Sequence, residues 1–538
     1  MSRGRSALAL GLAAAVLVLP SLILGSLASQ SAPQTLTWAE QFSEQFRAGI
    51  LYPRWMPDSF DGLGGPAFYF YPPLPFWLDA LVSVLTFNVL SVSHRLALDW
   101  LIVLFASGLA MRAWLVAATG RPRAALWGAL AYLAAPYHLF VDHYMRGAFA
   151  EATAYVLLPL VMLGLRRATD ERPGMVLLAL SYAGLLMSHL PTALLVSLTI
   201  VPAYAVYRAR GIAKLVHPLA GGVLGIGLAA IYLLPALQLQ GFISADQFWT
   251  RFYSVGNWFL LAPARWPEAI IMQAIASIGL AALVLALAVC LFGWKHVEAR
   301  FWAIVSVVCI ALLAGAVPWF WQLPEVAKVQ FPWRLMLAVE FAVITAICLL
   351  PPRRLARGEI YAFPLCVVLL VPGVGYGIAA AAAAVGLALR HQDVRAQDVR
   401  EYEPRGFPIA PQLTYSDLGL GAVQQLPPVS CASTARLCHA TAERFGDMRL
   451  EVDGDAPTRV TVRRFYFPAW AVDPPMAIVP TDDYRLVSFT IPAGHQMVRL
   501  GRTALPVERW GWAISGVTLL LLGVAAAISA RNTSRRGR

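Results

Sequence analysis

The sequence predicts a polytopic α-helical membrane protein with a small β-rich domain outside the membrane. Of its 538 residues, 59% are hydrophobic and only 13% are charged, whereas soluble domains are roughly 45–50% apolar. Apolar stretches of about 17–25 residues, the length that crosses a bilayer, recur along most of the chain. Near the C-terminus, apolar and polar residues instead alternate between Gly, Pro and Asp turns, which is typical of strands.

Twelve apolar stretches are candidate membrane spans. The first follows Arg3 and Arg5 and resembles a signal peptide. Because the chain that follows is itself membrane-embedded, we interpret the first stretch as an uncleaved signal anchor. The twelve candidates are 6–27, 96–116, 124–140, 152–165, 176–188, 192–207, 216–237, 269–294, 301–321, 335–350, 360–389 and 510–530.

The stretch 73–90 is apolar enough to be a thirteenth span, and the basic residues decide against it. If it lies on the outer face, the later Lys and Arg clusters share the side of Arg3 and Arg5, as the positive-inside rule requires. We therefore expect an amphipathic juxtamembrane helix there, with both termini on the cytoplasmic side of a bacterial inner membrane. The clusters lie at 112–123, 166–172, 208–214, 295–300, 353–357 and 531–538.

The net charge of +12 does not indicate a nucleic-acid partner, because the basic residues form short clusters between apolar runs. The expected partner of this surface is the lipid bilayer. The expected organisation is a signal-anchor helix, a first periplasmic loop with juxtamembrane helices, a helical body, a periplasmic β-rich domain resembling a small sandwich, and a last helix with a basic cytoplasmic tail. Their ranges are 1–28, 29–95, 96–389, 390–508 and 509–538.

Two cysteines, Cys431 and Cys438, lie close together in the predicted outer domain. An oxidising periplasm favours a disulfide between them. The other four cysteines lie in predicted helices, where a buried small apolar side chain is the expected role. None of the cysteine spacings is typical of a metal site.

Ionisable residues gather at the predicted outer membrane boundary, where their burial is costly and points to function. The stretch "DHYMRGAFAE" holds Asp142, His143, Arg146 and Glu151. Arg146 is placed either to hold an anionic phosphate or to pair with Asp142. Glu151 is placed either as a catalytic carboxylate or as a favourable charge at the start of a helix.

Two further candidates have equally open interpretations. His189 precedes Pro191 in "SHLP", where a hydrogen-bonded structural role and a ligand role are both consistent with the pattern. Arg334 in "VQFPWR" begins a span on the outer side, against the positive-inside trend. That placement favours an anionic partner, the alternative being a side chain that reaches to the interface.

No Walker loop, GxGxxG after a strand, GxSxG or HExxH is present. Nucleotide-driven chemistry on the cytoplasmic side therefore has no visible machinery. Three classes of function remain, namely chemistry on a lipid-linked donor at the outer face, transport, and a structural role.

A set of motifs in order carries a family resemblance: "RAGILYPRW", "GLGGPAFYFYPPLPFWL", "PYHLFVDHYMRGAFAE", "SHLP", "VQFPWR" and "RRFYFPAW". The chain resembles bacterial membrane proteins labelled 6-pyruvoyl-tetrahydropterin synthase-related, which are similar to the GT-C superfamily of polyprenyl-phosphate-sugar-dependent glycosyltransferases. The soluble zinc enzyme in that label, with its His triad, does not map onto these helices. The resemblance implies a GT-C-like fold whose first outer loop walls the active site, and Pro72, Pro73 and Leu74 match its Pro-Pro-Leu element.

The resemblance implies transfer of a sugar from a polyprenyl-phosphate donor to an envelope glycan, lipid or protein. This chemistry needs a carboxylate base and cations that stabilise the phosphate leaving group. It allows a divalent metal ion and does not require one. The aromatic rings of the first loop are placed to stack on a sugar or flank a prenyl chain. The residues expected to bind substrate are Arg54, Tyr69, Tyr71, His143, Arg146, His189, Gln330 and Arg334.

The base is not fixed by this resemblance. GT-C enzymes typically carry an acidic residue soon after the first helix, but "SQSAPQTLTWAEQFSEQF" has neither Asp nor His. Either catalysis is lost, or another carboxylate acts. The alternative to an enzyme is a transporter or assembly partner for lipid-linked envelope glycans; the few charges within the predicted spans favour the enzyme. The candidate bases are Glu40, Glu44, Asp58 and Asp61 of the first loop and Asp142 and Glu151 of the second.

Overall fold

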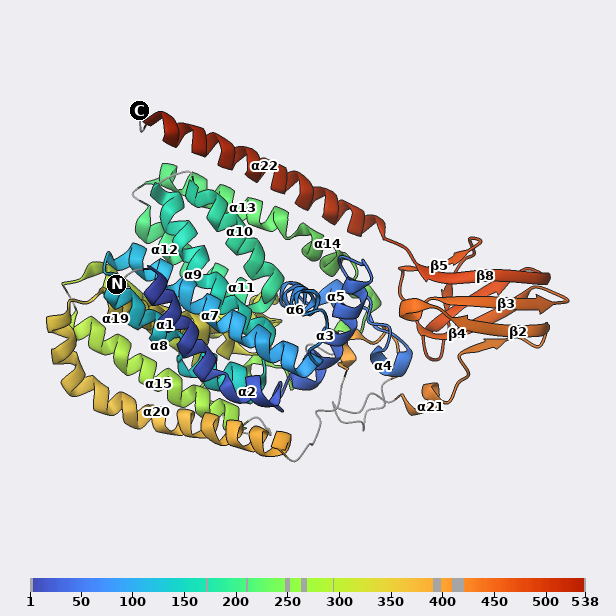
Figure 1. Cartoon of the computed structure of the whole chain (residues 1–538), viewed down its shortest axis with the longest axis horizontal. Coiled ribbons are helices and arrows are strands. Elements are labelled where there is room, and N and C mark those ends of the chain that lie inside the picture. The colour runs from blue at the N-terminus through green and yellow to red at the C-terminus, as the bar shows by residue number, and fades with distance from the viewer. Residues whose placement is uncertain are drawn as a thin grey trace.

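The computed structural model of the chain describes residues 3–170, 173–209, 211–246, 252–262, 269–293, 295–389, 398–408 and 420–536. A bundle of helices fills one end of the molecule, and a β-sandwich projects from the other (Figure 1). The predicted domain boundary at 390 lies outside the described residues, as do four residues from the basic clusters and spans, namely Arg172, Arg210, Trp294 and Arg538.

The bundle is formed by helices of very different length. Those of the first 200 residues are α1 (Arg3–Leu17), α2 (Leu19–Leu24), α3 (Ala32–Arg47), α4 (Ser59–Gly62), α5 (Ala67–Phe70), α6 (Leu74–Leu85), α7 (Val92–Thr119), α8 (Pro122–Leu133), the π-helical η1 (Tyr137–Arg146), α9 (Phe149–Asp170), α10 (Pro173–Ser188) and α11 (Leu190–Leu198). The later α-helices are α12 (Ile200–Arg208), α13 (Val216–Leu228), α14 (Ala230–Gln238), α15 (Ala269–Phe292), α16 (Val297–Leu313), α17 (Pro318–Gln322), α18 (Pro324–Ala327), α19 (Met336–Leu349), α20 (Pro352–Leu389), α21 (Gly421–Gln424) and α22 (Pro506–Arg536). Short 3₁₀ turns are η2 (Ile212–Leu215), η3 (Gln240–Phe242), η5 (Val255–Trp258), η6 (Pro332–Leu335), η7 (Arg400–Tyr402) and η8 (Arg444–Gly446).

Within the described residues, eight helical segments are long and apolar enough to cross a membrane, or nine if the bent pair α13 and α14 is one span. Every predicted span has a helical counterpart, but the total of twelve is not reached. The N-terminal stretch is divided at Val18 into α1 and α2. Helices α10 and α16 have 16 and 17 residues, or roughly 24–26 Å at 1.5 Å per residue, somewhat less than a hydrocarbon core of about 30 Å.

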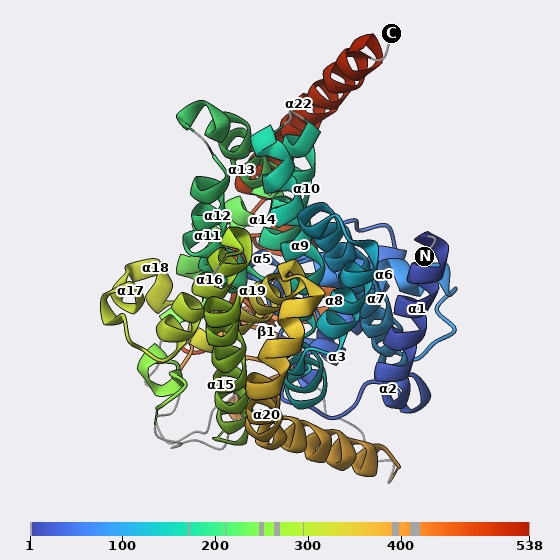
Figure 2. The same cartoon turned by 90° about the vertical axis from the view of Figure 1, so that its left-hand side faces the viewer.

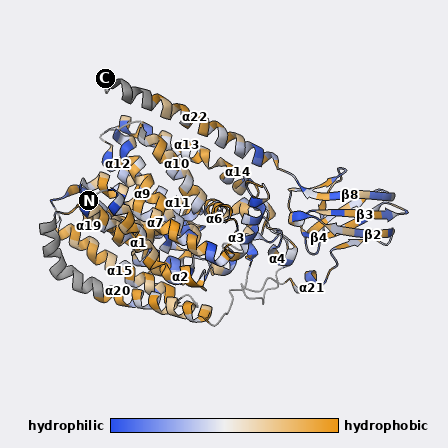
Figure 3. Cartoon of the chain, viewed as in Figure 1, coloured by the Kyte–Doolittle hydropathy of each residue, from blue (hydrophilic) through white to orange (hydrophobic). Residues whose placement is uncertain are grey.

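Hydropathy follows this arrangement. Apolar residues dominate α7, α15 and the coloured parts of α20 and α22, whereas polar residues alternate with apolar ones along the strands (Figure 3). The apolar core of the bundle is continuous and includes fully buried aromatic side chains from four helices, namely Trp114, Tyr155, Tyr204 and Trp302. The distribution of apolar residues therefore indicates one membrane-embedded helical body and one domain outside the membrane.

Helix α6 corresponds to the stretch 73–90. It has 12 residues, roughly 18 Å, which is too short to span. Figure 1 shows it nearly end-on, so it lies across the long axis of the bundle. Its buried face packs chiefly on α3 and also on α7, as expected for a juxtamembrane helix.

The β-domain contains two four-stranded sheets with antiparallel neighbours. One has the order β1-β4-β7-β6 and the other β2-β3-β8-β5. Alternating burial along β3 and β4 places apolar side chains between the sheets. The strands are β1 (Val429–Cys431), β2 (Ala435–Ala442), β3 (Met448–Gly454), β4 (Thr458–Phe465), β5 (Trp470–Asp473), β6 (Val479–Pro480), β7 (Leu486–Ile491) and β8 (Gly494–Arg502).

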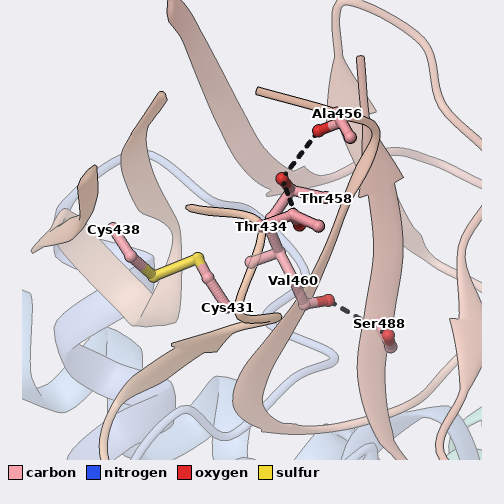
Figure 4. Close-up of a disulfide and its surroundings, with 7 residues drawn as sticks. All are labelled: Cys431, Thr434, Cys438, Ala456, Thr458, Val460 and Ser488. Carbon is pink, nitrogen blue, oxygen red and sulfur yellow. Dashed lines mark hydrogen bonds between the residues drawn. A yellow bond between two sulfur atoms is a disulfide. The ribbon is translucent and has the colours of Figure 1, made fainter. Parts of the chain in front are cut away.

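Cys431 and Cys438 are joined by a disulfide (Figure 4). It links β1 of one sheet to β2 of the other. Close by, the hydroxyls of Thr434 and Thr458 are 2.9 Å apart, and Thr458 donates to the Ala456 carbonyl. The bridge thus closes one corner of the sandwich.

The first loop and the β-domain share one apolar core. Trp55 packs against Trp470, Phe60 against Phe465, and Tyr69 against Phe467. The Phe465 amide donates to the Leu63 carbonyl at 2.8 Å. Two sequence motifs separated by about 400 residues, "GLGGPAFYFYPP" and "RRFYFPAW", therefore pack directly on one another.

The chain enters the β-domain after α20 and leaves it along α22, which returns beside α13 and α14. Figure 1 places both termini at the end of the bundle opposite the β-domain, and Figure 2 shows α22 and α20 at different edges of the bundle. The termini are thus on one side and the β-domain on the other.

Candidate functional site

A cavity of about 370 Å³ lies where the helical body meets the first loop and the segment leading to the β-domain. Six residues expected to bind substrate or act in catalysis line it, although they are spread over more than 260 positions. They are Tyr71, Arg146, Glu151, His189, Gln330 and Arg334. We call this space the bundle cavity.

The turn between η1 and α9 supplies two of these residues. Gly147 ends η1 with φ of +61° and reverses the chain direction. A Cβ at Gly147 would lie 2.1 Å from the Ser29 hydroxyl oxygen, so the turn needs glycine for both its backbone angle and its packing. On a continuous helix Arg146 and Glu151 would point in different directions; the turn brings them together.

Arg146 is the centre of a buried hydrogen-bonded network. Its Nη1 donates to Asp142 Oδ1 and to Glu151 Oε2, each at 2.7 Å, and lies 3.2 Å from the Tyr137 hydroxyl. That hydroxyl donates to Glu151 Oε1 at 2.7 Å. Both oxygens of Glu151 are therefore occupied, and the guanidinium and carboxylates fix one another in position.

Arg334 has a different environment. One of its terminal nitrogens donates to the Val329 carbonyl, and its guanidinium lies 5.2 Å from the centre of the Phe331 ring. Within the described residues, no carboxylate lies within ion-pair distance of it. Its Nε is buried without a hydrogen-bond partner. Arg334 is therefore a cavity cation whose charge the described protein atoms do not neutralise by direct contact.

Aromatic residues form much of the wall. Tyr71 packs 4.7 Å from Trp38 between ring centres. Burial raises the pKa of Tyr71 to about 12, while the charges of Arg334 and Arg146 act against the rise. Tyr71 is thus a neutral hydroxyl near both guanidinium groups at physiological pH.

His189 and Gln330 lie at breaks in the helical structure. His189 stands between α10 and α11, and its Nδ1 is 2.7 Å from the Thr192 hydroxyl. Gln330 has a positive φ of 69° just before η6. Both line the cavity through short irregular segments, which is where binding residues are frequently found.

Asp142 and His143 do not line the bundle cavity. Asp142 is fully buried, and its carboxylate forms an ion pair with Arg146. His143 lies beside a much smaller hollow, with Nε2 at 3.1 Å from the Ser21 hydroxyl and its ring 4.4 Å from Trp100. The structure thus places both as supports for the η1 turn.

The four first-loop candidate bases, Glu40, Glu44, Asp58 and Asp61, also lie outside the cavity lining. Glu40 is half exposed and reaches 3.9 Å from Arg95. Asp58 is exposed, and its backbone amide donates to Gln41 Oε1 at 2.7 Å. Glu151 is therefore the candidate base from the sequence that the structure brings into the bundle cavity.

Arg54 and Tyr69 line a separate cavity of about 720 Å³ between the first loop and the β-domain. Arg54 Nε lies 3.1 Å from Glu508 Oε2, and the Tyr69 hydroxyl donates to Glu508 Oε1 at 2.9 Å. We call this space the domain cavity. Tyr69 borders it and Tyr71 borders the bundle cavity, so the short segment 69–71 lies between the two.

Glu401 and Glu340 are buried carboxyl groups that were not expected from the sequence. Glu401, on η7, lines the bundle cavity. Glu340 accepts the backbone N–H groups of Tyr137 and His138 at 2.7 and 3.3 Å, which satisfies donors at the start of η1. Glu340 could have been noticed in the sequence, because a charged residue inside the predicted span 335–350 is costly. Glu401 has no sequence pattern that distinguishes it.

In the described part of the chain, no cluster of three or more His, Cys, Asp or Glu residues is arranged to hold a metal ion.

Fold and cavity together define a polytopic membrane protein with a polar, arginine-containing cavity beside a β-sandwich. The chain belongs to the 6-pyruvoyl-tetrahydropterin synthase related domain family, described as a membrane protein, whose profile matches residues 68–387. No curated protein matches the sequence.

Three solved structures are similar in part. The mycobacterial arabinofuranosyltransferase AftD has a TM-score of 0.41 at 17% identity, covering 72% of this chain and 28% of its own. ArnT from Cupriavidus metallidurans bound to undecaprenyl phosphate has a TM-score of 0.39 at 16% identity, covering 73% and 77%. Its apo state has a TM-score of 0.38 at 15% identity, covering 71% and 75%. This chain thus spans little more than a quarter of the AftD chain.

Proposed function

We propose that the protein is an integral membrane glycosyltransferase of GT-C type. It transfers a sugar from a polyprenyl-phosphate-linked donor to a cell-envelope acceptor at the periplasmic face. The observation that carries this proposal is Arg334, a cation in the bundle cavity that forms no ion pair with any described carboxylate. A phosphate of the donor supplies the missing charge.

The arrangement of charge supports the proposed periplasmic location. The termini and their basic residues lie at the end of the bundle opposite the β-domain (Figure 1), and basic segments favour the cytoplasm. The cavity is at the β-domain end. A disulfide in that domain is consistent with an oxidising compartment.

The reaction forms a bond from an acceptor hydroxyl to the anomeric carbon and breaks the bond from that carbon to the donor phosphate. The acceptor proton passes to a carboxylate, and negative charge develops on the leaving phosphate. Arg334 and Arg146 are placed to stabilise that charge. The aromatic wall around Tyr71 and Trp38 excludes water from the sugar.

Two carboxylates are placed to accept the proton. Glu151 lines the cavity but already accepts from Arg146 and the Tyr137 hydroxyl, which stabilises its charged form. Glu401 lines the same cavity from the β-domain side of the chain. A base loses its function on conversion to Gln, whereas a residue that only positions Arg146 retains part of it.

The donor site is tested with undecaprenyl phosphate and purified protein in native mass spectrometry. We expect wild-type protein to retain the lipid and Arg334→Gln to bind it at least tenfold more weakly, with Arg334→Lys between them. Lys328→Gln is the matched control, because Lys328 is exposed on the same segment and pairs with Glu325. Equal lipid retention by Arg334→Gln and the control would contradict the proposed role of Arg334.

Catalysis is tested by mass spectrometry of envelope glycans in a deletion strain complemented with each variant. We expect the deletion to remove one sugar modification and wild-type protein to restore it. If neither Glu151→Gln nor Glu401→Gln restores the modification, both residues are essential. If only one of the two variants fails, that residue is the base. If all carboxylate variants restore normal glycans while the deletion does not, the proton-transfer scheme is wrong; accumulation of an intact lipid-linked glycan would favour transport.

A further inference from the structure

The domain cavity is larger than the bundle cavity and is built from different elements. Its walls come from the end of α3, the segment 50–55, the η8 turn between β2 and β3, and the chain between β8 and α22. The bundle-cavity residues Arg146, Glu151 and Arg334 do not contribute to it. It requires an explanation of its own.

Most charges around the domain cavity are paired with one another. Arg499 lies 2.8 Å from Glu443 and 3.5 Å from Asp447, and Arg502 lies 3.5 Å from Asp447. The Arg54 and Glu508 side chains form the pair already described. Paired charges present donors and acceptors in fixed directions while their long-range fields largely cancel.

This arrangement differs from that around Arg334. An anion entering the domain cavity would compete with carboxylates already bound to the arginines. An uncharged molecule with many hydroxyl groups would instead hydrogen-bond to the unused faces of those pairs. The pairing of Arg54, Arg499 and Arg502 therefore favours a neutral polar ligand. Arg444, the fourth arginine of the lining, is exposed and forms no ion pair within the described residues.

Several polar atoms of the lining residues lack partners. Gln45 Oε1, Arg54 Nη1 and Trp55 Nε1 are buried and make no hydrogen bond. All three residues border the cavity, and each is at least nine-tenths buried. Unsatisfied buried groups are few in folded proteins and call for a partner such as water or a ligand. The Tyr52 hydroxyl is likewise buried without a partner and belongs to the same lining. One acceptor, two donors and one hydroxyl group on the walls of one cavity match a hydroxyl-bearing molecule.

The η8 turn holds an aromatic residue in an unfavourable backbone conformation. Phe445 has φ of +59°, a region that bulky residues rarely adopt. Its carbonyl accepts from Arg502 Nη2 at 3.0 Å. The residue is half buried and lines both the domain cavity and a neighbouring hollow. Glycine would adopt this backbone conformation at lower cost, so the presence of Phe445 indicates a role for its aromatic ring.

We propose that the domain cavity is a binding site for an uncharged saccharide. The Phe445 ring stacks on a sugar face at the entrance, and the paired charges with Gln45, Arg54 and Trp55 receive its hydroxyl groups. The site is separate from the cavity of the proposed transferase reaction and does not depend on that activity. Its ligand is either the glycan part of an envelope lipid or a free oligosaccharide.

The test is binding of the full chain in detergent micelles to an array of neutral gluco-, manno-, galacto-, rhamno- and arabino-oligosaccharides, with sulfated and sialylated glycans alongside. We expect binding to one neutral class. Phe445→Gly should weaken this binding at least tenfold without lowering the melting temperature, because glycine suits the positive φ. To separate the two ligand sources, binding of the same glycan is measured with and without its lipid anchor, each in competition with the free oligosaccharide.

The variant Arg334→Gln distinguishes this proposal from the proposed transferase. It should weaken retention of undecaprenyl phosphate at least tenfold and leave saccharide binding unchanged. The proposal is overturned if no neutral oligosaccharide binds, if only charged glycans bind, or if Phe445→Gly binds as wild type. Loss of saccharide binding in Arg334→Gln with an unchanged melting temperature would also overturn it, because the two cavities would then be one site.

Discussion

Gly147→Ala should destabilise the protein and separate Arg146 from Glu151. A left-handed backbone costs a residue with a Cβ about 1–2 kcal/mol, and Gly147 has φ of +61°. The new methyl group would also lie 2.1 Å from Ser29 Oγ and 3.2 Å from Ser29 Cβ. Overpacking of this kind costs about 1–3 kcal/mol, so we expect a total loss of roughly 2–5 kcal/mol.

Gly120→Ala provides a matched control for the backbone cost. Gly120 ends α7 with φ of +65°, and a Cβ there would meet no atom within 4 Å. Its substitution should therefore cost only the backbone part, about 1–2 kcal/mol. Adding Ser29→Ala to Gly147→Ala should recover most of the steric part, since the nearest atom is then removed.

The assay is unfolding in mixed micelles followed by tryptophan fluorescence, with retention of undecaprenyl phosphate measured on the folded fraction. Gly147→Ala should lose more stability than Gly120→Ala and should retain less lipid. Equal stability losses in the two variants, or no recovery on adding Ser29→Ala, would refute the packing argument for the turn.

Three other predictions concern regions outside the bundle cavity. Burial raises the pKa of Glu403 to about 8 from 4.5, so the folded protein holds a proton that the unfolded chain releases, and stability falls as pH rises between these values. Glu403→Gln should therefore increase the free energy of unfolding at pH 9 by up to about 5 kcal/mol, which raises the melting temperature. At pH 4 the substitution should change the melting temperature little. An equal effect at both pH values would contradict the ionisation argument. Replacing Cys431 and Cys438 by Ser should cost about 2 kcal/mol in the β-domain and leave lipid retention unchanged, and peptide mapping that finds two free thiols in wild type would exclude the bridge. Val89→Cys, in the exposed turn after α6, should react with an impermeant maleimide from the periplasm, and labelling only from the cytoplasmic side would overturn the orientation.

The sequence identified the embedded helices because apolar length is a local property. The number of spans was harder to predict, because hydropathy does not register breaks. The stretch 6–27 is uniformly apolar, yet its helix is interrupted at Val18. The stretch 216–237 is likewise apolar, but its two helices meet at 65°.

The bundle cavity was partly predictable for a different reason. A charge at a membrane boundary is conspicuous, so Arg146, Glu151 and Arg334 stood out against their apolar surroundings. The assignment of Arg54 and Tyr69 to a separate cavity could not be predicted, because it depends on the partner Glu508, about 440 positions away. Glu401 lies in a polar segment, where one more carboxylate does not stand out from the neighbouring residues.

The ion pair between Arg54 and Glu508 has a consequence for biosynthesis. Tyr69 and Glu508 are 439 positions apart in the chain, and ribosomes add about 5–20 residues per second. The first loop is therefore synthesised roughly 20–90 s before its partner. During that interval Arg54 lacks its carboxylate partner. Nascent chains stopped before α22 lack this carboxylate, so limited proteolysis should cleave them near Arg54 more readily than completed chains, in which the arginine is buried.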